Sequence, residues 1–322
     1  MLQVKPTTVR TGEPRDSSFG STLRGVTAMV AAQLVFLLND VLNKLASERL
    51  PMGEIIFIRG LLATLLVSCV VVALGLHRQL PLLRHRLVAL RVIGELGGTF
   101  FFFIALFHMP IGNAMIIFQA VPLMVTAGAA VFFREAVGWR RWTAVGVGFL
   151  GVVIVVRPGL SGFDVFGVLV LVSVLFVAFR DLVTRAMPSG IPTLCLTLIT
   201  AASVAAMGAL MGLTEDWVLP APRELAEVSG ASIFLSAGYV TSIIAMRNGD
   251  MSVTACFRYV AVVFAVAAGF LVWGDVPDLA TIIGSFVIIG AGLYTLYREH
   301  KVARAGRPLI AAPASIDSST RG

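Results

Sequence analysis

Charged residues are scarce in this sequence: Asp, Glu, Lys and Arg together supply 13% of its 322 residues. A soluble domain carries roughly 25% of these residues, so the shortage argues against a soluble fold. Hydrophobic residues supply 57% of the chain, and the mean hydropathy is +0.91. They fall in runs of about 18 to 23 residues, the length that a helix needs to cross the hydrocarbon core of a bilayer. The composition therefore predicts an all-α polytopic membrane protein.

Catalytic and metal-binding patterns are also missing. The three cysteines, Cys69, Cys195 and Cys256, lie in separate apolar runs and provide neither a disulfide framework nor metal-ligand spacing. The four histidines are scattered, and no HExxH, CxxC or paired-carboxylate pattern occurs. We therefore expect no metal, no cofactor and no enzymatic activity. The alternative from another class is a polytopic membrane enzyme, which would need a His, Asp or Glu cluster at the membrane interface or a substantial catalytic loop.

The first 24 residues lack the apolar core of a signal peptide, so we expect a disordered tail before an uncleaved first helix. Residues 298–322 are expected to form a second disordered tail. Between the tails, runs separated by charge, Pro or Gly predict ten membrane spans. They lie near residues 25–45, 53–75, 88–108, 111–133, 142–156, 166–186, 192–213, 228–246, 251–273 and 279–296.

The net charge of +7 is distributed unevenly along the chain. If the N-terminus is cytoplasmic and the chain crosses the membrane ten times, most Lys and Arg residues fall on the cytoplasmic side. Such asymmetry follows the positive-inside rule. It predicts a multi-pass protein of the cell inner membrane with both termini in the cytoplasm. The basic residues therefore give no reason to expect nucleic acid as a partner.

Short segments recur at a nearly constant offset. The hexapeptides "NDVLNK" (39–44) and "RDLVTR" (180–185) lie 141 positions apart and share one polar and apolar pattern. Residues 127–135 and 267–275 correspond at an offset of 140. Because five is an odd number of spans, the two halves must cross the membrane in opposite directions. The loop after the first block is basic and the corresponding loop after the second block is acidic, as expected for loops on opposite sides of the membrane. Inverted repeats are typical of secondary transporters. Chance similarity between apolar helices is the alternative.

Residues 122–159 carry a proline in the fourth predicted span, a glutamate at its end, an Arg-Trp pair, spaced glycines and a closing Arg-Pro-Gly. These residues are Pro122, Glu135, Arg141, Trp142, Gly148, Gly151, Arg157, Pro158 and Gly159. The pattern resembles the half-repeat of the EamA-type transporters in the drug/metabolite transporter superfamily. The resemblance extends over roughly residues 24–297 and is looser in the second half, where Val262 replaces the proline and Asp275 the glutamate.

The resemblance implies ten helices in two inverted five-helix repeats around a central cavity. We accordingly divide the chain into a tail (1–24), two repeats (25–160 and 161–297) and a second tail (298–322). The expected function is secondary transport of a small polar organic metabolite by alternating access. A carrier for uptake of a cofactor such as riboflavin or S-adenosylmethionine is the alternative. The partners are a small-molecule substrate and the lipid bilayer, and the sequence leaves a homodimer open.

Ionisable residues inside spans are the main site candidates, because each costs about 2.5–3.5 kcal/mol at a helix centre. Arg59 and Arg258 are expected to line a polar cavity and to attract an anionic or zwitterionic substrate group. Glu95 would be a counter-ion or a proton-coupling site, and its depth of roughly 10 Å matches that of Arg258, which permits a pair. Gln119 and Tyr259, related by the offset of 140, are candidate hydrogen-bonding groups. Structural pairs between helices are the alternative for all of them.

The two hexapeptides are candidates for gate or coupling elements. In each, Asp and a base are four residues apart on one helical face, so Asp40 can pair with Lys44 and Asp181 with Arg185. The orientation places Asp40 and Lys44 at the outer end of the first span, and Arg180 and Asp181 at the inner end of the sixth. We expect symmetric contacts that form alternately as the cavity opens to each face. The alternative is that these bases simply extend to the membrane interface.

Overall fold

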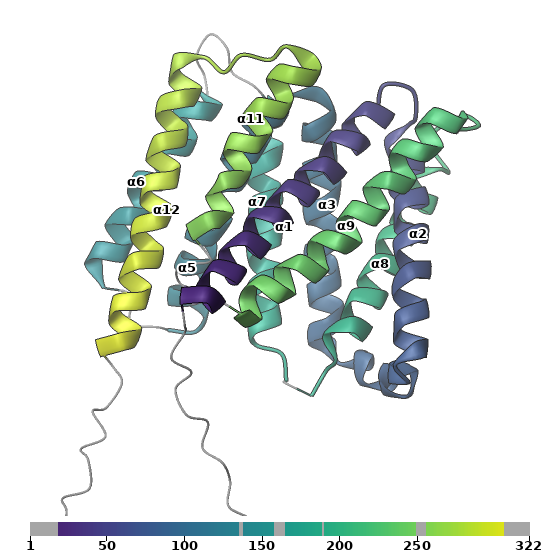
Figure 1. Ribbon diagram of the computed structural model, residues 1–322, viewed down its shortest axis with the longest axis horizontal. Helices are drawn as coiled ribbons and strands as arrows, with labels where there is room; N and C mark the ends of the chain where they lie inside the picture. The colour runs from purple at the N-terminus through teal and green to yellow at the C-terminus, as the bar shows by residue number, and fades with distance from the viewer. Residues whose placement is uncertain (1–18, 135–137, 158–164, 189, 249–255, 306–322) are drawn as a thin grey trace, which may run out of the picture.

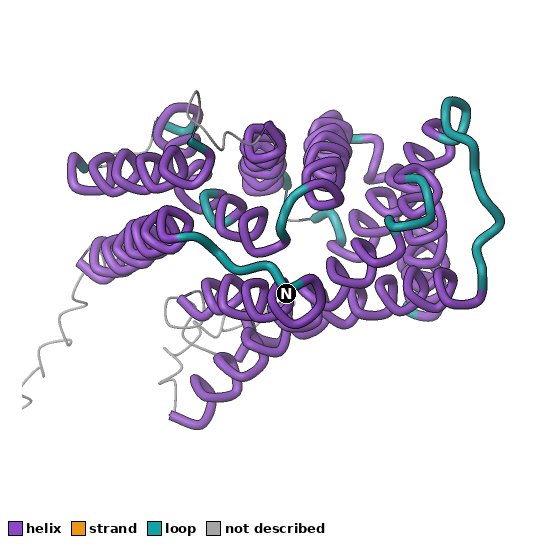
Figure 2. Tube along the Cα trace, turned by 90° about the horizontal axis from the view of Figure 1, so that it is seen from above, coloured by secondary structure: helices purple, strands orange, loops and turns teal. Residues whose placement is uncertain are grey.

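The computed structural model describes residues 19–134, 138–157, 165–188, 190–248 and 256–305. Within these ranges every regular element is a helix, and no strand occurs (Figures 1 and 2). The helices are α1 (Phe19–Ala46), α2 (Met52–Ala73), the 3-10 helix η1 (Leu76–Arg84), α3 (Arg86–His108), α4 (Ile111–Phe118), α5 (Val121–Phe132), α6 (Trp139–Val156), α7 (Val165–Arg185), α8 (Thr193–Met211), α9 (Pro222–Asn248), the 3-10 helix η2 (Phe257–Tyr259), α11 (Val260–Trp273) and α12 (Leu279–Ala305).

Eight helices of the described chain are long and apolar enough to cross a membrane, α4 and α5 counting as one. They coincide with eight of the ten predicted spans, which confirms the all-helical membrane fold. The predicted span 228–246 lies within α9, which carries charged residues in its first turn. The described part of the span 251–273 is η2 followed by α11, a shorter apolar stretch. The count of ten spans therefore stays a prediction.

The helices at the two chain ends are longer than the predicted spans. α1 begins at Phe19, inside the segment that was expected to be a tail, and α12 continues to Ala305. Arg, Glu, Lys and Ala after Arg298 favour helix once the apolar run has ended, so the helix does not stop at the membrane surface. The remaining tail residues, 1–18 and 306–322, lie outside the described part of the chain.

The packing of the helices agrees with an inverted repeat. The most extensive contacts join α1 with α9, α3 with α7, α2 with α8, and α6 with α12. If five spans of one half map onto five of the other, the α1–α9 pair maps onto the α7–α3 pair. The other two pairs each map onto themselves. The observed neighbours are therefore those that a twofold relation between the halves requires, in line with the layout of inverted-repeat transporters.

Equivalent glycines allow close approach in the two related interfaces. An added Cβ at Gly97 in α3 would overlap the ring of Phe176, and one at Gly238 in α9 would overlap the ring of Phe36. Gly97 and Gly238 are 141 positions apart, the offset of the two hexapeptides. A Cβ at Gly94 would lie 2.9 Å from Cβ of Arg180. The Gly94-x-x-x-Gly98 spacing thus lets α7 approach α3 closely.

Both ends of the described chain, the start of α1 and the end of α12, lie toward one side of the bundle, the lower side in Figure 1. We call this side the terminal end. The opposite side, which carries the connections α1–α2, α8–α9 and α11–α12, is the distal end (Figure 1). These two names describe the molecule alone and assign neither end to a compartment.

Candidate functional site

Charged side chains from four helices converge inside the bundle. The bases are Arg59 on α2, Arg91 on α3 and Arg180 on α7, and the acids are Asp40 on α1, Glu95 on α3 and Asp181 on α7. We call these six residues the central charge cluster. Its members interact electrostatically, and three charges of each sign cancel. Since all six lie within spans or within one turn of a span end, their mutual compensation lowers the cost of burial.

Arg180 connects the two halves within this cluster. Its Nη1 donates a hydrogen bond of 2.9 Å to Oε2 of Glu95, which belongs to the other half. Its Nε and Nη2 both donate to Oδ1 of Asp181, at 2.9 and 2.8 Å. Charge-assisted hydrogen bonds of this kind are the strong ones. Glu95 therefore has Arg180 as its partner, and the pair with Arg258 that equal depth permitted is not observed between these described residues.

Arg59 is buried but makes no hydrogen bond through its guanidinium to any described residue. The residue is 7% exposed, and its guanidinium carbon lies 4.6 Å from the centre of the Phe103 ring. Its main electrostatic partner is Asp40, whose carboxylate accepts one hydrogen bond, from Nδ2 of Asn39 at 2.9 Å. A guanidinium carries five N–H donors, and burial makes unused donors costly. Within the described part of the chain, the Arg59 guanidinium donors are thus left without a hydrogen bond.

The sequence interpretation missed Arg91, a member of the cluster, and Tyr239, which lies beside it. Nη1 of Arg91 donates to Oγ1 of Thr200 on α8 at 2.6 Å. The hydroxyl of Ser232 on α9 donates to the carbonyl of Arg59. Ser232 lies 141 positions after Arg91, and Thr200 lies 141 positions after Arg59. The Arg91–Thr200 contact and the Ser232–Arg59 contact are therefore equivalent under the repeat. Arg91 could have been found, because it lies one helical turn before Glu95.

Tyr239 on α9 lies beside the central charge cluster. Its phenol interacts electrostatically with Glu95, Arg180 and Arg59, and its ring meets Phe36 edge to face at 5.7 Å. Although it faces buried charges, Tyr239 is 44% exposed. The phenol therefore lies among the charges, while part of the residue is exposed on the surface of α9. No signal in the sequence marked Tyr239, since its counterpart at the offset of 141 is Gly98.

Gln119, Arg258 and Tyr259 lie together, at the breaks in the fourth and ninth helical segments. Pro122 in the first turn of α5 follows the break after α4, and η2 precedes α11 at the corresponding place. Nε2 of Gln119 donates to the carbonyl of Arg258 at 3.2 Å. Oη of Tyr259 is buried without a partner among the described residues, and its ring packs on Gly292 of α12. No recorded contact joins these described residues to the central charge cluster.

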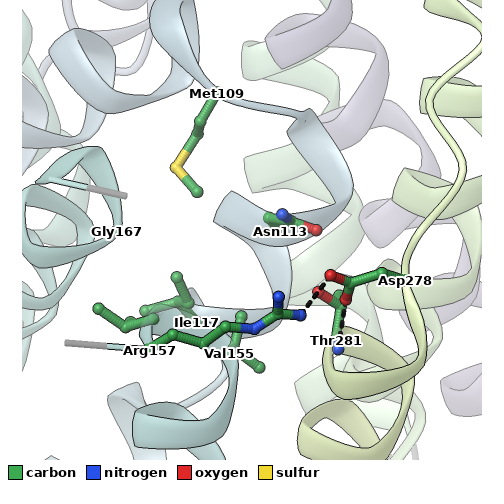
Figure 3. Close-up of a pocket in the computed structure, with 9 residues that line it drawn as sticks. Met109, Asn113, Ile117, Val155, Arg157, Gly167, Asp278 and Thr281 are labelled. Atoms are coloured by element: carbon green, nitrogen blue, oxygen red, sulfur yellow. Dashed lines mark hydrogen bonds and ion pairs between the residues drawn. The ribbon is translucent and has the colours of Figure 1, made fainter. Parts of the chain in front are cut away.

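The distal end is held closed by contacts that cross between the halves. Arg157 at the end of α6 forms an ion pair with Asp278 before α12 (Figure 3). Thr281 donates its backbone N–H to the same carboxylate at 2.8 Å. The backbone donation and the Arg157 guanidinium lower the pKa of Asp278 to about 2. This pair therefore stays ionised throughout the neutral range.

Further contacts close the distal end beside α9. Nη1 of Arg49 donates to Glu224 at 3.0 Å. The backbone N–H of Gly53 donates to Glu215 at 2.8 Å, and that of Val218 donates to the buried carboxylate of Glu54 at 3.1 Å. Each of these contacts joins the first half of the chain to the second.

Lys44 belongs to the distal end and does not pair with Asp40, so that part of the expected ion pairing is wrong. Its Nζ donates to the carbonyls of Leu106 and Met109, at 2.7 and 2.5 Å. These carbonyls are left unpaired where α3 ends, and a lysine is a favoured partner there. The four-carbon stem lets Lys44 reach them instead of folding back along its own helix. Asp181, for its part, takes the adjacent Arg180 as partner.

A small pocket lies at the distal end between the halves (Figure 3). Its empty volume is about 350 Å³, open solvent included, and Asn113, Arg157 and Asp278 provide its polar groups. In the described part of the chain, no group of three or more His, Cys, Asp or Glu side chains could hold a metal ion. Cys69, Cys195 and Cys256 form no disulfide bonds with one another. Glu135, Pro158 and Gly159 of the resembling pattern lie outside the described residues.

These features define a multi-pass helical membrane protein with a polar site between two inverted halves. A family model described as the EamA-like transporter family matches residues 23–157 and 166–297. The chain belongs to the EamA-like transporter family. It is a membrane transporter for a small molecule and not an enzyme.

Three relatives show how similar the chain is to known transporters. It is 29% identical to the pseudopaline exporter CntI of Pseudomonas aeruginosa, over 83% of this chain and 94% of that protein. It is 26% identical to an S-adenosylmethionine uptake transporter of Rickettsia prowazekii, over 87% of this chain and 94% of the relative. It is 25% identical to a riboflavin transporter of Vibrio cholerae, over 88% and 97%. A solved crystal structure, 20% identical and with a TM-score of 0.60, covers 87% of this chain and 98% of its own, which supports the fold.

Proposed function

We propose that this protein is a secondary transporter of the cell inner membrane that moves a small polar metabolite by alternating access. The proposed substrate carries an anionic or zwitterionic group. The observation that carries this assignment is Arg59, a buried guanidinium without a hydrogen-bond acceptor in the described chain. A carboxylate of the substrate would accept its donors in bidentate geometry.

Asp40 supports a substrate that also carries a positive charge or N–H donors. Its carboxylate has one hydrogen-bond donor, Asn39, and its electrostatic partner Arg59 lies on α2 without a direct ion pair. A zwitterion placed between these two groups would satisfy both. Tyr239 and Phe36 would form the aromatic side of this site, since the Tyr239 ring is exposed beside the cluster. The substrate-binding group would thus be Asp40, Arg59, Glu95 and Tyr239.

The other candidate residues take roles according to their neighbours. Gln119, Arg258 and Tyr259 would form a second polar group at the helix breaks, where unwound backbone supplies additional hydrogen-bonding groups. Lys44 would act in the distal gate. Arg180 and Asp181 would hold the terminal side of the cluster together through Glu95.

The orientation follows from the distribution of basic residues. The positive-inside rule assigns the terminal end to the cytoplasm and the distal end to the outside. The distal contacts of Arg157, Arg49, Gly53 and Val218 then close the outer side. We therefore assign the structure to a state that is closed to the outside.

A cofactor-like substrate is the second candidate. Its support is the similarity to two cofactor transporters over almost the whole length of each. The direction of transport stays open, because the relatives include an exporter and uptake transporters.

Substrate binding to purified protein tests the role of Arg59. A metabolite panel would first be screened by thermal stabilisation, and the ligand found would be titrated against Arg59→Ala and Arg59→Lys. Loss of charge-assisted hydrogen bonds worth about 1.5–3 kcal/mol should raise Kd about 10- to 150-fold in Arg59→Ala. The matched control is Arg223→Gln, which removes an exposed pair with Glu227 on the same helix. Unchanged affinity in a folded Arg59→Ala protein would contradict the proposed site.

A further inference from the structure

The connection between α2 and α3 is a short helix with an exposed basic side. This helix, η1, lies at the terminal end of the bundle, below α2 in Figure 1. Gly75, a left-handed residue with a φ of 68°, ends α2 and turns the chain into η1. Sγ of Cys195 on α8 donates to the carbonyl of Leu76 at 3.5 Å. η1 is therefore held against the end of the bundle.

The three-residue period of a 3-10 helix separates the basic and the apolar side chains of η1. Side chains three positions apart lie one above the other, so Arg78 and Arg84 share a face with Pro81 between them. At a rise of about 2.0 Å per residue, the two arginines are roughly 12 Å apart along the helix. Leu80 and Leu82 belong to the other two faces and are 37% and 49% exposed. The helix thus presents arginines and leucines side by side at its surface.

The arginines of this connection have no acidic partners. Arg78, Arg84 and Arg86 are exposed, and none of them forms an ion pair or a side-chain hydrogen bond with another described residue. η1 contacts α2, α3 and α8. The sequence has no Asp or Glu between Glu54, at the distal start of α2, and Glu95, inside the bundle, and α8 has none. The positive charge of η1 is therefore not compensated by the helices that it contacts.

The equivalent connection in the second half shows that the fold does not need these arginines. Residues 217–225 lie 141 positions after η1 and join α8 to α9 at the distal end. Leu219 and Leu225 stand there in place of Arg78 and Arg84. The same join between two helices is thus made with and without the arginines. Their role is therefore outside the packing of the bundle.

We propose that η1 is a binding surface for the headgroups of anionic phospholipids in the membrane leaflet at the terminal end. The planar guanidinium groups of Arg78 and Arg84 match phosphate oxygens in bidentate geometry. Exposed leucines beside them enter the boundary between headgroups and acyl chains, as on interfacial helices. Basic segments next to membrane spans are attracted to anionic lipids in this way. The surface acts independently of the transported substrate.

Binding of phosphatidylglycerol to the purified full-length protein tests the surface. Its Kd would be measured in detergent by native mass spectrometry, with phosphatidylcholine as the neutral comparison. Arg78→Gln and Arg84→Gln should each raise the Kd for phosphatidylglycerol about fivefold, and the double variant about 30-fold, with little effect on phosphatidylcholine. The matched control is Arg24→Gln/Arg223→Gln, which removes the same two charges from exposed positions at the starts of α1 and α9. The control should change the Kd less than about threefold.

The leucines distinguish a lipid surface from simple attraction between charges. Leu80→Gln/Leu82→Gln keeps both arginines and should raise the Kd for phosphatidylglycerol about tenfold, because it removes apolar area from the headgroup boundary. Weaker binding in both η1 double variants, at an unchanged melting temperature in detergent, supports the proposal. Unchanged binding in the arginine variant overturns it, and the arginines would then act only in the orientation of the chain. A loss no larger than that of the control, or a loss confined to the arginine variant, also overturns it.

Discussion

Removal of Arg180 should destabilise the protein more than removal of its partner Glu95. Arg180→Gln deletes three charge-assisted hydrogen bonds and leaves the carboxylates of Glu95 and Asp181 without their cation. Glu95→Gln deletes one of them and leaves Arg180 paired with Asp181. The asymmetry arises from the position of Arg180 between two acids.

The size of this effect follows from the burial of the pair. Breaking a buried ion pair costs about 3–5 kcal/mol, because it leaves an uncompensated buried charge. The side chains of Arg180 and Glu95 are 24% and 14% exposed, so solvent screening reduces the cost. We expect about 2–3 kcal/mol for Arg180→Gln and about 1 kcal/mol for Glu95→Gln.

A double-mutant cycle provides the assay. The unfolding free energies of wild type, both single variants and Arg180→Gln/Glu95→Gln would be compared in detergent at neutral pH. The double variant should be less destabilised than the sum of the single variants, by about 1 kcal/mol, because the orphaned Glu95 charge is removed. Equal effects of the two single variants, or strict additivity, would refute the bridging role of Arg180.

Three further predictions concern packing, the distal ion pair and the site. Gly94→Ala should cost about 1–3 kcal/mol of unfolding free energy, because its Cβ would lie 2.9 Å from Cβ of Arg180, whereas Gly146→Ala should be nearly neutral, since nothing lies within 4 Å. The pKa of Asp278 is lowered to about 2 in the folded protein. The difference in unfolding free energy between wild type and Asp278→Asn should therefore stay constant above pH about 4 and shrink as the pH falls towards 2. A difference that shrinks already near neutral pH would contradict the pairing with Arg157. Tyr239→Phe should raise the KM for the substrate about three- to tenfold with little change in melting temperature, because it removes only a hydroxyl beside the cluster. Tyr294→Phe, at an exposed position of α12, is the control. An equal change in KM for both variants would exclude a specific role of Tyr239.

The fold was largely predictable because the controlling signals are local. Apolar run lengths predicted the spans that qualify by length and composition, and the offset near 140 predicted which helices are equivalent. The lengths of α1 and α12 were not predicted, because helix propensity continues a helix beyond its apolar run. The family resemblance was confirmed over both repeats.

The central charge cluster contains Arg59 and Glu95, two of the predicted binding residues, but the sequence did not predict how they pair. Arg59 and Glu95 were predicted as site residues because a charged side chain inside a membrane span costs free energy and usually has a function. Their partners depend on the rotation of each helix about its axis, which a single sequence does not encode. Arg258 and Arg180 are both plausible partners of Glu95 by depth, and packing selected Arg180. The flexible stem of Lys44 similarly allowed a partner on another helix, against the simple four-residue rule.

Tyr239 shows why some site residues leave no sequence signal. A tyrosine in an apolar span is ordinary, and the repeat places glycine at the equivalent position. Its relation to the cluster arises only when α9 packs across α1. The roles of Gln119, Arg258 and Tyr259 in substrate binding stay predictions.

Counterflow in proteoliposomes tests the central claim most directly. Purified protein would be reconstituted with one unlabelled metabolite inside, and entry of the labelled metabolite would be followed for a panel of anionic, zwitterionic and cofactor-like solutes, with and without a pH gradient. The account predicts saturable exchange of at least one anionic or zwitterionic solute, strongly reduced in Arg59→Ala and intact in Arg223→Gln. Absence of exchange for every solute, or exchange that is unaffected by Arg59→Ala, would contradict it.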